Sequence, residues 1–167
     1  MTDPVTDPVL PVFVYGTLRP GGRYHDRYLG GRCERIEPAV LAGAALHDGP
    51  GYPYAVADAD PTRRVRGELV TVHEAAFARV LAALDVLEEC RPDGTGLYVR
   101  LRRPVTVETA PEAAPAPAPA PDLAPGPERG GAARTVAAWV YLAGPELTAR
   151  LRAAPAPIHS GDWTARG

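Results

Sequence analysis

The sequence places one carboxylate on the apolar side of its most regular predicted helix. Residues 74–89 favour a helix because they are rich in Ala, Leu, Arg, Glu and Val. At about 100° per residue, Glu88 falls about 20° from Phe77, within an apolar stripe. That stripe consists of Phe77, Val80, Leu81 and Leu84. Burial disfavours the charged carboxylate and raises its pKa, which suits a general acid/base at neutral pH. The alternative is that the helix ends before Glu88 and the side chain bends into water.

A second candidate for chemistry is the segment Tyr-Gly-Thr-Leu-Arg at residues 15–19, which opens into a Gly-rich loop. Successive backbone N–H groups in such a turn can hold an anion such as a carboxylate. Thr17 adds a hydroxyl and Arg19 adds a positive charge. The plainer interpretation is an ordinary turn in which Gly16 supplies backbone angles that other residues avoid.

Aromatic side chains on two predicted strands form a third candidate. Tyr98 begins a Tyr-Val-Arg run, and Trp139 and Tyr141 lie in another strand. Aromatic residues in this setting more often belong to a core than to a site. A phenol that faces the same cavity as Glu88 would nevertheless hydrogen-bond a substrate or a developing oxyanion.

Several other chemistries have no support in the sequence. There is no P-loop, no GxGxxG, no HExxH and no CxxC motif, and the four histidines lack metal-ligand spacing. We therefore expect no metal. Cys33 and Cys90 are too few for a disulfide framework, and we expect reduced thiols. All 18 basic residues are Arg, so no Lys Schiff base can form.

Short strands must position these candidate residues around the helix. The predicted strands cover residues 11–15, 36–46, 54–56, 65–72, 97–108 and 135–142. Pro104 interrupts the fifth of them, which indicates an edge or a bulge. A short second helix is predicted at residues 145–152. Five or more strands around one long helix indicate an α+β fold, for which a small barrel is one arrangement.

The 167 residues fit one domain, predicted over residues 11–167 after a flexible leader at 1–10. Residues 109–133 are an Ala/Pro-rich insert that we expect to be disordered and solvated. A net charge of −2 gives no strong attraction to nucleic acid. Neither a signal peptide nor an apolar run long enough to span a membrane is present, so we expect a cytoplasmic protein.

The order of these motifs resembles the gamma-glutamylcyclotransferase-like family. The resemblance rests on YGTLRPGG followed by His25, then YPYAV, VRGELVTV, LDVLEE, LYVR and WVY, and it runs from about Phe13 to Tyr141 without the insert. It implies a small mixed β-barrel of about five to seven strands with one main flanking helix. It also implies an enzyme that needs neither metal nor cofactor. In that reaction the α-amine of a γ-glutamyl group attacks its own γ-amide, releasing 5-oxoproline and an amine or amino acid.

The resemblance also assigns roles to residues. Glu88 matches the catalytic glutamate, which takes a proton from the α-ammonium and passes one to the leaving nitrogen. The loop that holds the glutamyl end matches Tyr15, Gly16, Thr17 and Leu18, and Tyr98 matches an aromatic residue of the pocket. Two departures stand out: Glu89 occupies a position where the family commonly has Gly, and Tyr24 precedes His25 where the family often has Asn.

Other readings of the sequence remain open. The chain could be a non-catalytic module that binds a γ-glutamyl-like metabolite or regulates a partner. A small barrel for single-stranded nucleic acid is a weaker alternative, because it needs a basic groove with stacking aromatics. We expect a small-molecule partner, no nucleic-acid or membrane partner, and a monomer or weak dimer. The sequence does not determine which amine or amino acid would be released.

Overall fold

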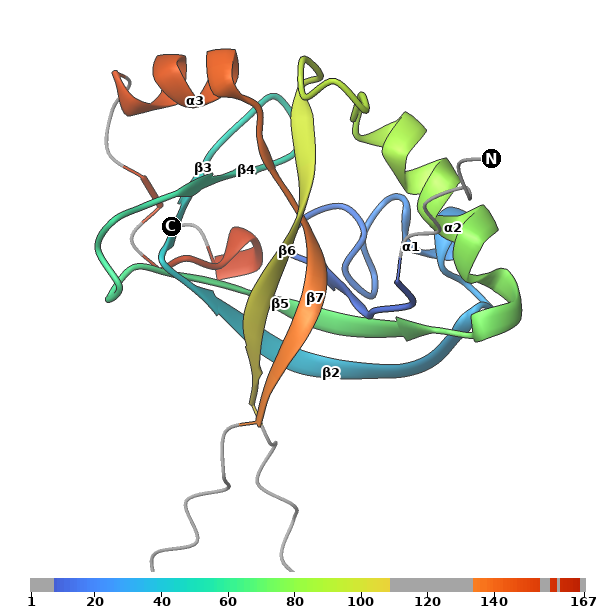
Figure 1. Ribbon diagram of the computed structural model, residues 1–167. Helices are drawn as coiled ribbons and strands as arrows, with labels where there is room; N and C mark the ends of the chain where they lie inside the picture. Colours follow the sequence, from blue (N-terminus) through green and yellow to red (C-terminus); the bar gives the residue numbers. More distant parts are fainter. Residues whose placement is uncertain (1–7, 109–133, 154–156, 159, 166–167) are drawn as a thin grey trace, which may run out of the picture.

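The computed structural model describes residues 8–108, 134–153, 157–158 and 160–165 (Figure 1). Most of the predicted leader and the whole predicted insert at 109–133 lie outside the described residues. The predicted division into leader, domain and insert therefore stays a prediction. Within the described residues, no helix is both long and apolar enough to cross a membrane.

Five strands close into a barrel in the order β1–β5–β2–β6–β7. They are β1 (Val12–Val14), β5 (Arg64–Val72), β2 (Cys33–Ala42), β6 (Tyr98–Val107) and β7 (Arg134–Ala143). Neighbours run antiparallel except β1 and β7, whose parallel pairing closes the barrel. The expectation of a small mixed α+β barrel is thus confirmed.

Strand β1 explains why the sequence shows a continuous apolar run before the candidate loop. Successive side chains of a strand point to opposite faces. Phe13 belongs to the hydrophobic cluster that also contains Leu69 and Val140. Val12 and Val14 belong to a second cluster, which includes buried residues of the long helix. Both faces of β1 are therefore buried, and the strand ends directly at the loop.

The predicted strand at residues 36–46 is wrong as a single element. It is two strands, β2 and β3 (Ala44–His47), separated by Gly43 with φ of +72°. Few residues other than glycine adopt this left-handed backbone, and it ends β2 after its long pairing with β5. Strand β3 instead pairs with β4 (Tyr54–Ala57) in a separate two-stranded sheet.

Pro104 does not break β6, and no bulge is present there. The strand stays in register with β7, where Pro104 lies opposite Ala137. On its other side β6 pairs with β2 only through Thr106 and Val107. Pro104 therefore lies where β6 has an open edge, and its missing N–H is tolerated there.

The long helix α2 (Glu74–Leu87) packs on the outside of the barrel through Phe77, Val80, Leu81 and Leu84. It ends two residues before the predicted boundary. The predicted short helix is confirmed as α3 (Pro145–Arg152), whereas α1 (His25–Tyr28) and a 3-10 turn at Trp163–Ala165 were not predicted. Figure 1 shows α2 and α1 on one side of the barrel and α3 beside β3 and β4 on the other.

Candidate functional site

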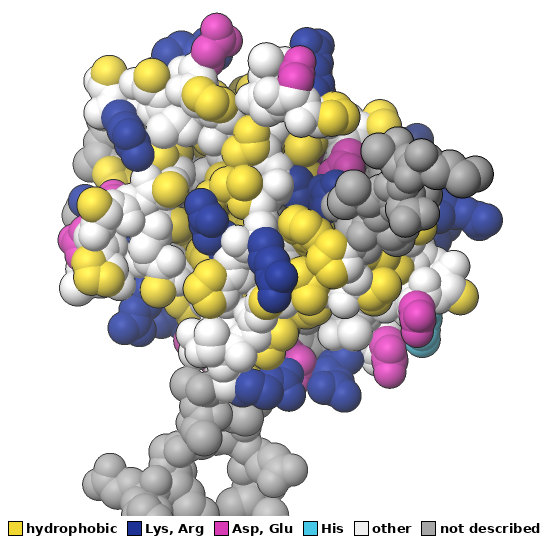
Figure 2. Space-filling view, viewed as in Figure 1, with side chains coloured by type: hydrophobic (Ala, Val, Ile, Leu, Met, Phe, Trp, Pro, Cys, Tyr) yellow, Lys and Arg dark blue, Asp and Glu magenta, His cyan; other side chains and the backbone are white. Residues whose placement is uncertain are grey.

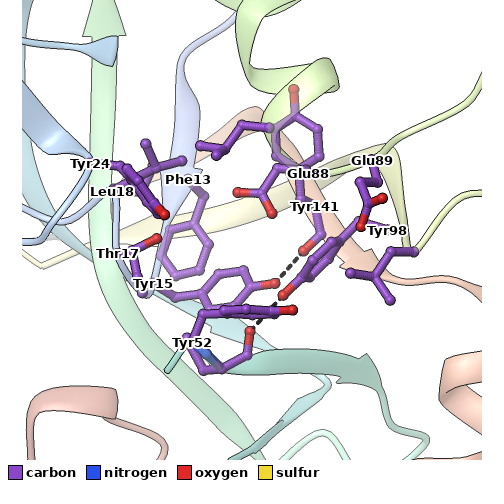
Figure 3. A pocket seen from close by; sticks show the side chains of 15 residues that line it. Phe13, Tyr15, Thr17, Leu18, Tyr24, Tyr52, Glu88, Glu89, Tyr98 and Tyr141 are labelled. Atoms are coloured by element: carbon purple, nitrogen blue, oxygen red, sulfur yellow. Dashed lines mark hydrogen bonds between the residues drawn. The ribbon is translucent and has the colours of Figure 1, made fainter. Parts of the chain in front are cut away.

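A cavity of about 150 Å³ lies where β1, the loop after it and the end of α2 meet. All six residues predicted for the site line this cavity: Tyr15, Gly16, Thr17, Leu18, Glu88 and Tyr98. Figure 3 shows Tyr15, Thr17 and Leu18 from the loop after β1, Glu88 from the end of α2 and Tyr98 from β6 around this cavity. Sequence analysis missed further lining residues, among them Tyr24, Tyr52 and Pro53. These come from loops whose path could not be deduced from periodicity.

Glu88 is the C-cap residue of α2 and not part of its last turn. Its φ of −85° and ψ of 4° stay close to helical values, and its N–H donates to Leu84 O at 2.9 Å. The side chain therefore keeps roughly the direction that periodicity assigned to it. Figure 3 shows the carboxylate directed into the cavity. The alternative reading was right that the helix ends early and wrong that the side chain turns into water.

The surroundings of Glu88 favour its protonated form. Burial raises the pKa of its carboxyl from 4.5 to about 7. Among the described residues, only Glu88 and Glu89 line the cavity with charged side chains, so no basic side chain of that lining offsets the burial. A carboxylate that gains and loses a proton near neutral pH is suited to general acid/base catalysis.

Three of the five tyrosines that line the cavity donate hydrogen bonds from their phenols to the protein. Tyr98 donates to Pro53 O at 2.8 Å, Tyr15 donates to the backbone oxygen of Tyr141, and Tyr141 donates to Asp85 Oδ1 at 2.7 Å. Burial, together with nearby carboxylates, raises the pKa of all three phenols, so they stay neutral. The predicted donation from Tyr98 to an oxyanion therefore conflicts with its contact to Pro53. Tyr98 shapes the wall and can still accept a hydrogen bond.

Backbone N–H groups of the loop are better donors for an anion. Gly16 O accepts from the Arg19 N–H and Thr17 O from the Tyr24 N–H, each at 3.0 Å. These bonds hold the loop in a tight turn. Within the described part of the chain, the N–H groups of Thr17 and Leu18 have no hydrogen-bond acceptor. Such successive N–H groups suit a carboxylate or a developing oxyanion.

Arg19 does not supply positive charge to the cavity, contrary to the role considered for it from sequence. Its Nε donates to Glu68 Oε2 at 2.7 Å and its Nη1 to Asp162 Oδ1 at 2.6 Å. Glu68 lies on β5 and Asp162 in the C-terminal segment. Arg19 therefore fixes the far end of the loop against the barrel.

The close packing of the loop predicts the result of adding one methyl group. A Cβ at Gly16 would lie 2.6 Å from Pro53 Cδ, well inside van der Waals contact. We expect Gly16→Ala to lower the free energy of unfolding by about 1–3 kcal/mol, because the proline ring or the loop must move. Urea unfolding of the two proteins measures this. An unchanged midpoint would show that the loop is not held against Pro53.

A supporting cluster that sequence analysis did not identify anchors the last turn of α2. Arg100 Nε donates to Asp85 Oδ1 at 2.9 Å, and the Tyr141 hydroxyl donates to the same oxygen. The Arg100 guanidinium also lies 4.6 Å from the ring centroid of Trp139. Asp85 precedes Glu88 by three residues, so the cluster ties the helix end to β6 and β7. Arg100 and Tyr141 lie 15 and 56 positions from Asp85 in the sequence, too far for a local sequence pattern to reveal these contacts.

Glu89 departs from the resemblance at a position with an unusual backbone. Its φ is +48°, the left-handed region that favours glycine. We expect Glu89→Gly to raise the free energy of unfolding by about 1 kcal/mol, because the backbone strain disappears. Chemical denaturation measures the change.

The control for this substitution is Ala82→Gly, in an exposed position within α2. Glycine at this position should lower the free energy of unfolding by about 1 kcal/mol, because glycine has a lower helix propensity than alanine. If glycine destabilises equally at both positions, Glu89 carries no strain.

Among the described residues, no group of three or more His, Cys, Asp or Glu side chains could hold a metal ion. Cys33 and Cys90 are free thiols. The chemistry that the described cavity offers is therefore proton transfer by a carboxylate beside a loop with unsatisfied N–H groups. His159, one of the four histidines of the sequence, lies outside the described residues.

Comparison with protein families gives a match over residues 12–165 to the family described as gamma-glutamyl cyclotransferase, AIG2-like. Among curated proteins, none matches the chain. The matched range includes every residue that lines the cavity.

Solved structures with the same fold include proteins from Pyrococcus horikoshii, mouse and yeast. An uncharacterized protein, PH0828 from Pyrococcus horikoshii, is 20% identical with a TM-score of 0.51, covering 92% of this chain and 89% of that one. A mouse AIG2-like protein is 22% identical with a TM-score of 0.50, covering 82% and 80%. A yeast gamma-glutamyl cyclotransferase specific to glutathione is 15% identical with a TM-score of 0.52, covering 88% and 79%. At these identities the likeness shows the fold.

Proposed function

Because the chain belongs to the gamma-glutamyl cyclotransferase, AIG2-like family, we propose that it converts a γ-glutamyl amide into 5-oxoproline and a free amine or amino acid. The observation that carries the proposal is the carboxylate of Glu88. It points into a cavity beside the loop whose Thr17 and Leu18 N–H groups have no acceptor among the described residues, and burial raises its pKa to about 7. The yeast neighbour, a gamma-glutamyl cyclotransferase specific to glutathione, supports γ-glutamyl chemistry in this fold.

In the proposed reaction the substrate supplies both the nucleophile and the electrophile. Glu88 accepts a proton from the α-ammonium, and the α-nitrogen then attacks the γ-carbonyl carbon of the same glutamyl group. Ring closure within one molecule already brings the reacting atoms together, so the cavity must mainly fold the chain. Glu88 then passes a proton to the departing nitrogen as the amide C–N bond breaks.

The loop supplies the remaining stabilisation in this proposal. The backbone N–H groups of Thr17 and Leu18 bind the α-carboxylate or the oxyanion that forms at the γ-carbon. Tyr15, Gly16 and Tyr98 complete the wall around the glutamyl group. Each step uses a group of the chain itself, so the proposed reaction needs no cofactor.

The second candidate is a binding module that holds a γ-glutamyl-like metabolite without turnover. The observation that favours it is Glu89, a negative charge at the cavity where the resemblance leads one to expect Gly. A nucleic-acid function has less support. On the face shown in Figure 2, basic side chains are scattered between apolar ones and do not form a continuous groove.

The test is 5-oxoproline release from a panel of γ-glutamyl amides, followed by chromatography of both products. Equal amounts of 5-oxoproline and amine, formed over many turnovers, would support the cyclotransferase. Stoichiometric binding without release, measured by calorimetry on the same compounds, would favour the binding module. If the folded protein neither turns over nor binds any compound of a broad panel, both candidate functions are rejected.

A further inference from the structure

Four successive carbonyl groups of the loop after β1 accept hydrogen bonds from the protein. Three of them, those of Gly16, Thr17 and Arg19, accept from backbone N–H groups. The fourth carbonyl differs because its donor is a side chain: His25 Nδ1 lies 2.8 Å from Leu18 O. One imidazole ring therefore completes a set of bonds that the backbone otherwise provides.

These bonds set the direction of the N–H groups of the loop. In a planar trans peptide the C=O and the N–H point to opposite sides. Because Gly16 O and Thr17 O are held by protein donors, the N–H groups of Thr17 and Leu18 in the same two peptides point the other way. The next peptide carries Leu18 O and the Arg19 N–H, which donates to Gly16 O and closes the turn. His25 thus holds the peptide on which the turn closes.

The chemistry of this contact determines which ring nitrogen of His25 carries hydrogen. A carbonyl oxygen only accepts hydrogen bonds, so Nδ1 must be the donor. The neutral ring with its hydrogen on Nδ1 and the doubly protonated ring both donate from this atom. The bond to Leu18 O therefore persists whether or not Nε2 carries a proton.

His25 is itself fixed by the short helix α1. It begins this helix, and its carbonyl accepts from the Leu29 N–H at 2.8 Å and from the Gly30 N–H at 3.0 Å. Leu29 is fully buried in the hydrophobic cluster that contains Leu81 and Leu84 of α2. The ring of His25 is thus anchored to the core, and it does not itself line the described cavity.

We propose that His25 is a positioning residue, whose Nδ1–H holds the Leu18 carbonyl so that the N–H groups of Thr17 and Leu18 face the substrate. The inference rests on the proposed function, in which these two N–H groups bind the α-carboxylate or the oxyanion. His25 does not contact the substrate and does not exchange a proton in the reaction. It keeps two donors aligned before the substrate arrives, and such preorganisation is what makes a donor effective in catalysis.

Two substitutions separate the hydrogen bond from the bulk of the ring. In His25→Asn the side-chain amide nitrogen is bonded to Cγ, as Nδ1 is, and can donate to the same oxygen. His25→Leu fills similar space without a donor. We expect His25→Leu to lower kcat/KM for 5-oxoproline release about 10- to 100-fold, because small misplacements in a site cost up to about 100-fold. His25→Asn should stay within about threefold of the natural chain, because it keeps the hydrogen bond.

The control is His73→Leu, which removes a histidine at the N-cap of α2. His73 is exposed, its side chain makes no capping hydrogen bond, and it does not line the cavity. It should leave kcat/KM within about twofold of the natural value, as is usual for a surface substitution. The acidic limb of the pH profile should stay in place in all variants, because Glu88 sets it. A limb that moves in His25→Asn would show that His25 exchanges a proton and would overturn the positioning role.

NMR of the natural protein gives a test that needs neither turnover nor a variant that folds. With ¹⁵N-labelled histidine at about pH 9, where ordinary histidines are neutral, His25 should carry hydrogen on Nδ1 and none on Nε2. Hydrogen on Nε2 alone would mean that the bond to Leu18 O is absent, and the proposal would be overturned whatever the activity. Loss of one signal in His25→Asn assigns the resonance.

The kinetic outcomes separate this proposal from the proposed function. If His25→Leu is folded and as active as the natural chain, or if His25→Asn loses as much activity as His25→Leu, the positioning role is wrong and the cyclotransferase stands. If the natural chain releases no 5-oxoproline, the proposed function fails. In that case ¹⁵N relaxation decides: Thr17 and Leu18 amides that become mobile in His25→Leu but not in His25→Asn support the positioning role, and equal mobility overturns it.

Discussion

Replacing Glu88 by Gln is expected to lower kcat for 5-oxoproline release by about 10³-fold. The amide has nearly the same shape as the carboxylate, so it fills the same space in the cavity. It cannot take the proton of the α-ammonium or return one to the leaving nitrogen. General acid/base groups contribute about 10²- to 10⁴-fold, and Glu88 has both roles in the proposed reaction. The rate of 5-oxoproline formation at saturating substrate concentration measures the effect.

The same variant should be more stable than the natural chain at pH 8. Burial raises the pKa of Glu88 from 4.5 to about 7, so at pH 8 the folded state holds a charge that the unfolded state solvates better. Removing the carboxylate should therefore raise the free energy of unfolding by about 1–3 kcal/mol. This result would exclude misfolding as the cause of lost activity.

Glu34→Gln is the matched control, because Glu34 is exposed on β2 and does not line the cavity. It should keep kcat within about twofold. A folded Glu88→Gln protein with more than about a tenth of the natural kcat would contradict the acid/base role. The reaction would then need another proton acceptor.

Periodicity identified Glu88 although the predicted helix was too long. The reason is that the C-cap residue keeps near-helical angles, so the projection that describes α2 remains valid for one more residue. At Glu89 the backbone turns left-handed and the projection fails. Local sequence thus predicted the direction of the carboxylate, and the resemblance agreed with it.

Other features of the site depend on contacts between distant parts of the chain. The Tyr98 hydroxyl donates to a carbonyl 45 positions earlier, and Arg19 pairs with a carboxylate 143 positions later. No periodic pattern encodes such a pairing. The contacts therefore oppose two expected roles, the positive charge of Arg19 at the loop and donation by the Tyr98 hydroxyl to a substrate, although Tyr98 does line the cavity. Gly43 shows the same limit for the fold, since its positive φ follows from the path between two sheets.

The pH dependence of kcat/KM is expected to follow the titration of Glu88. As the base in the proposed reaction, Glu88 must be ionised in the free enzyme. Below its pKa of about 7 the ionised fraction falls about tenfold per pH unit, so kcat/KM should be about 100-fold lower at pH 5 than on its plateau. The profile should rise with pH and level off above about 7.

Tyr15, Tyr98 and Tyr141 do not produce this profile, because burial raises the pKa of each of these phenols. Initial rates between pH 5 and pH 8.5, at constant ionic strength, give the measurement. Any residual activity of Glu88→Gln should lack the acidic limb. A natural profile that is flat from pH 5 to pH 8, or that falls as pH rises, would show that ionised Glu88 is not the base.

The stability of the folded protein should change in the opposite direction over the same range. The pKa of Glu88 is higher in the folded state than in the unfolded chain, so between pH 4.5 and about 7 the folded state binds more protons. The contribution of Glu88 to the free energy of unfolding is therefore fully present below about pH 4.5 and is lost as pH rises through about 7. It should amount to about 1–3 kcal/mol, taken as the difference between the natural chain and Glu88→Gln at each pH. Because the ionised carboxylate that catalysis requires is the form that burial disfavours, activity should rise as this contribution disappears.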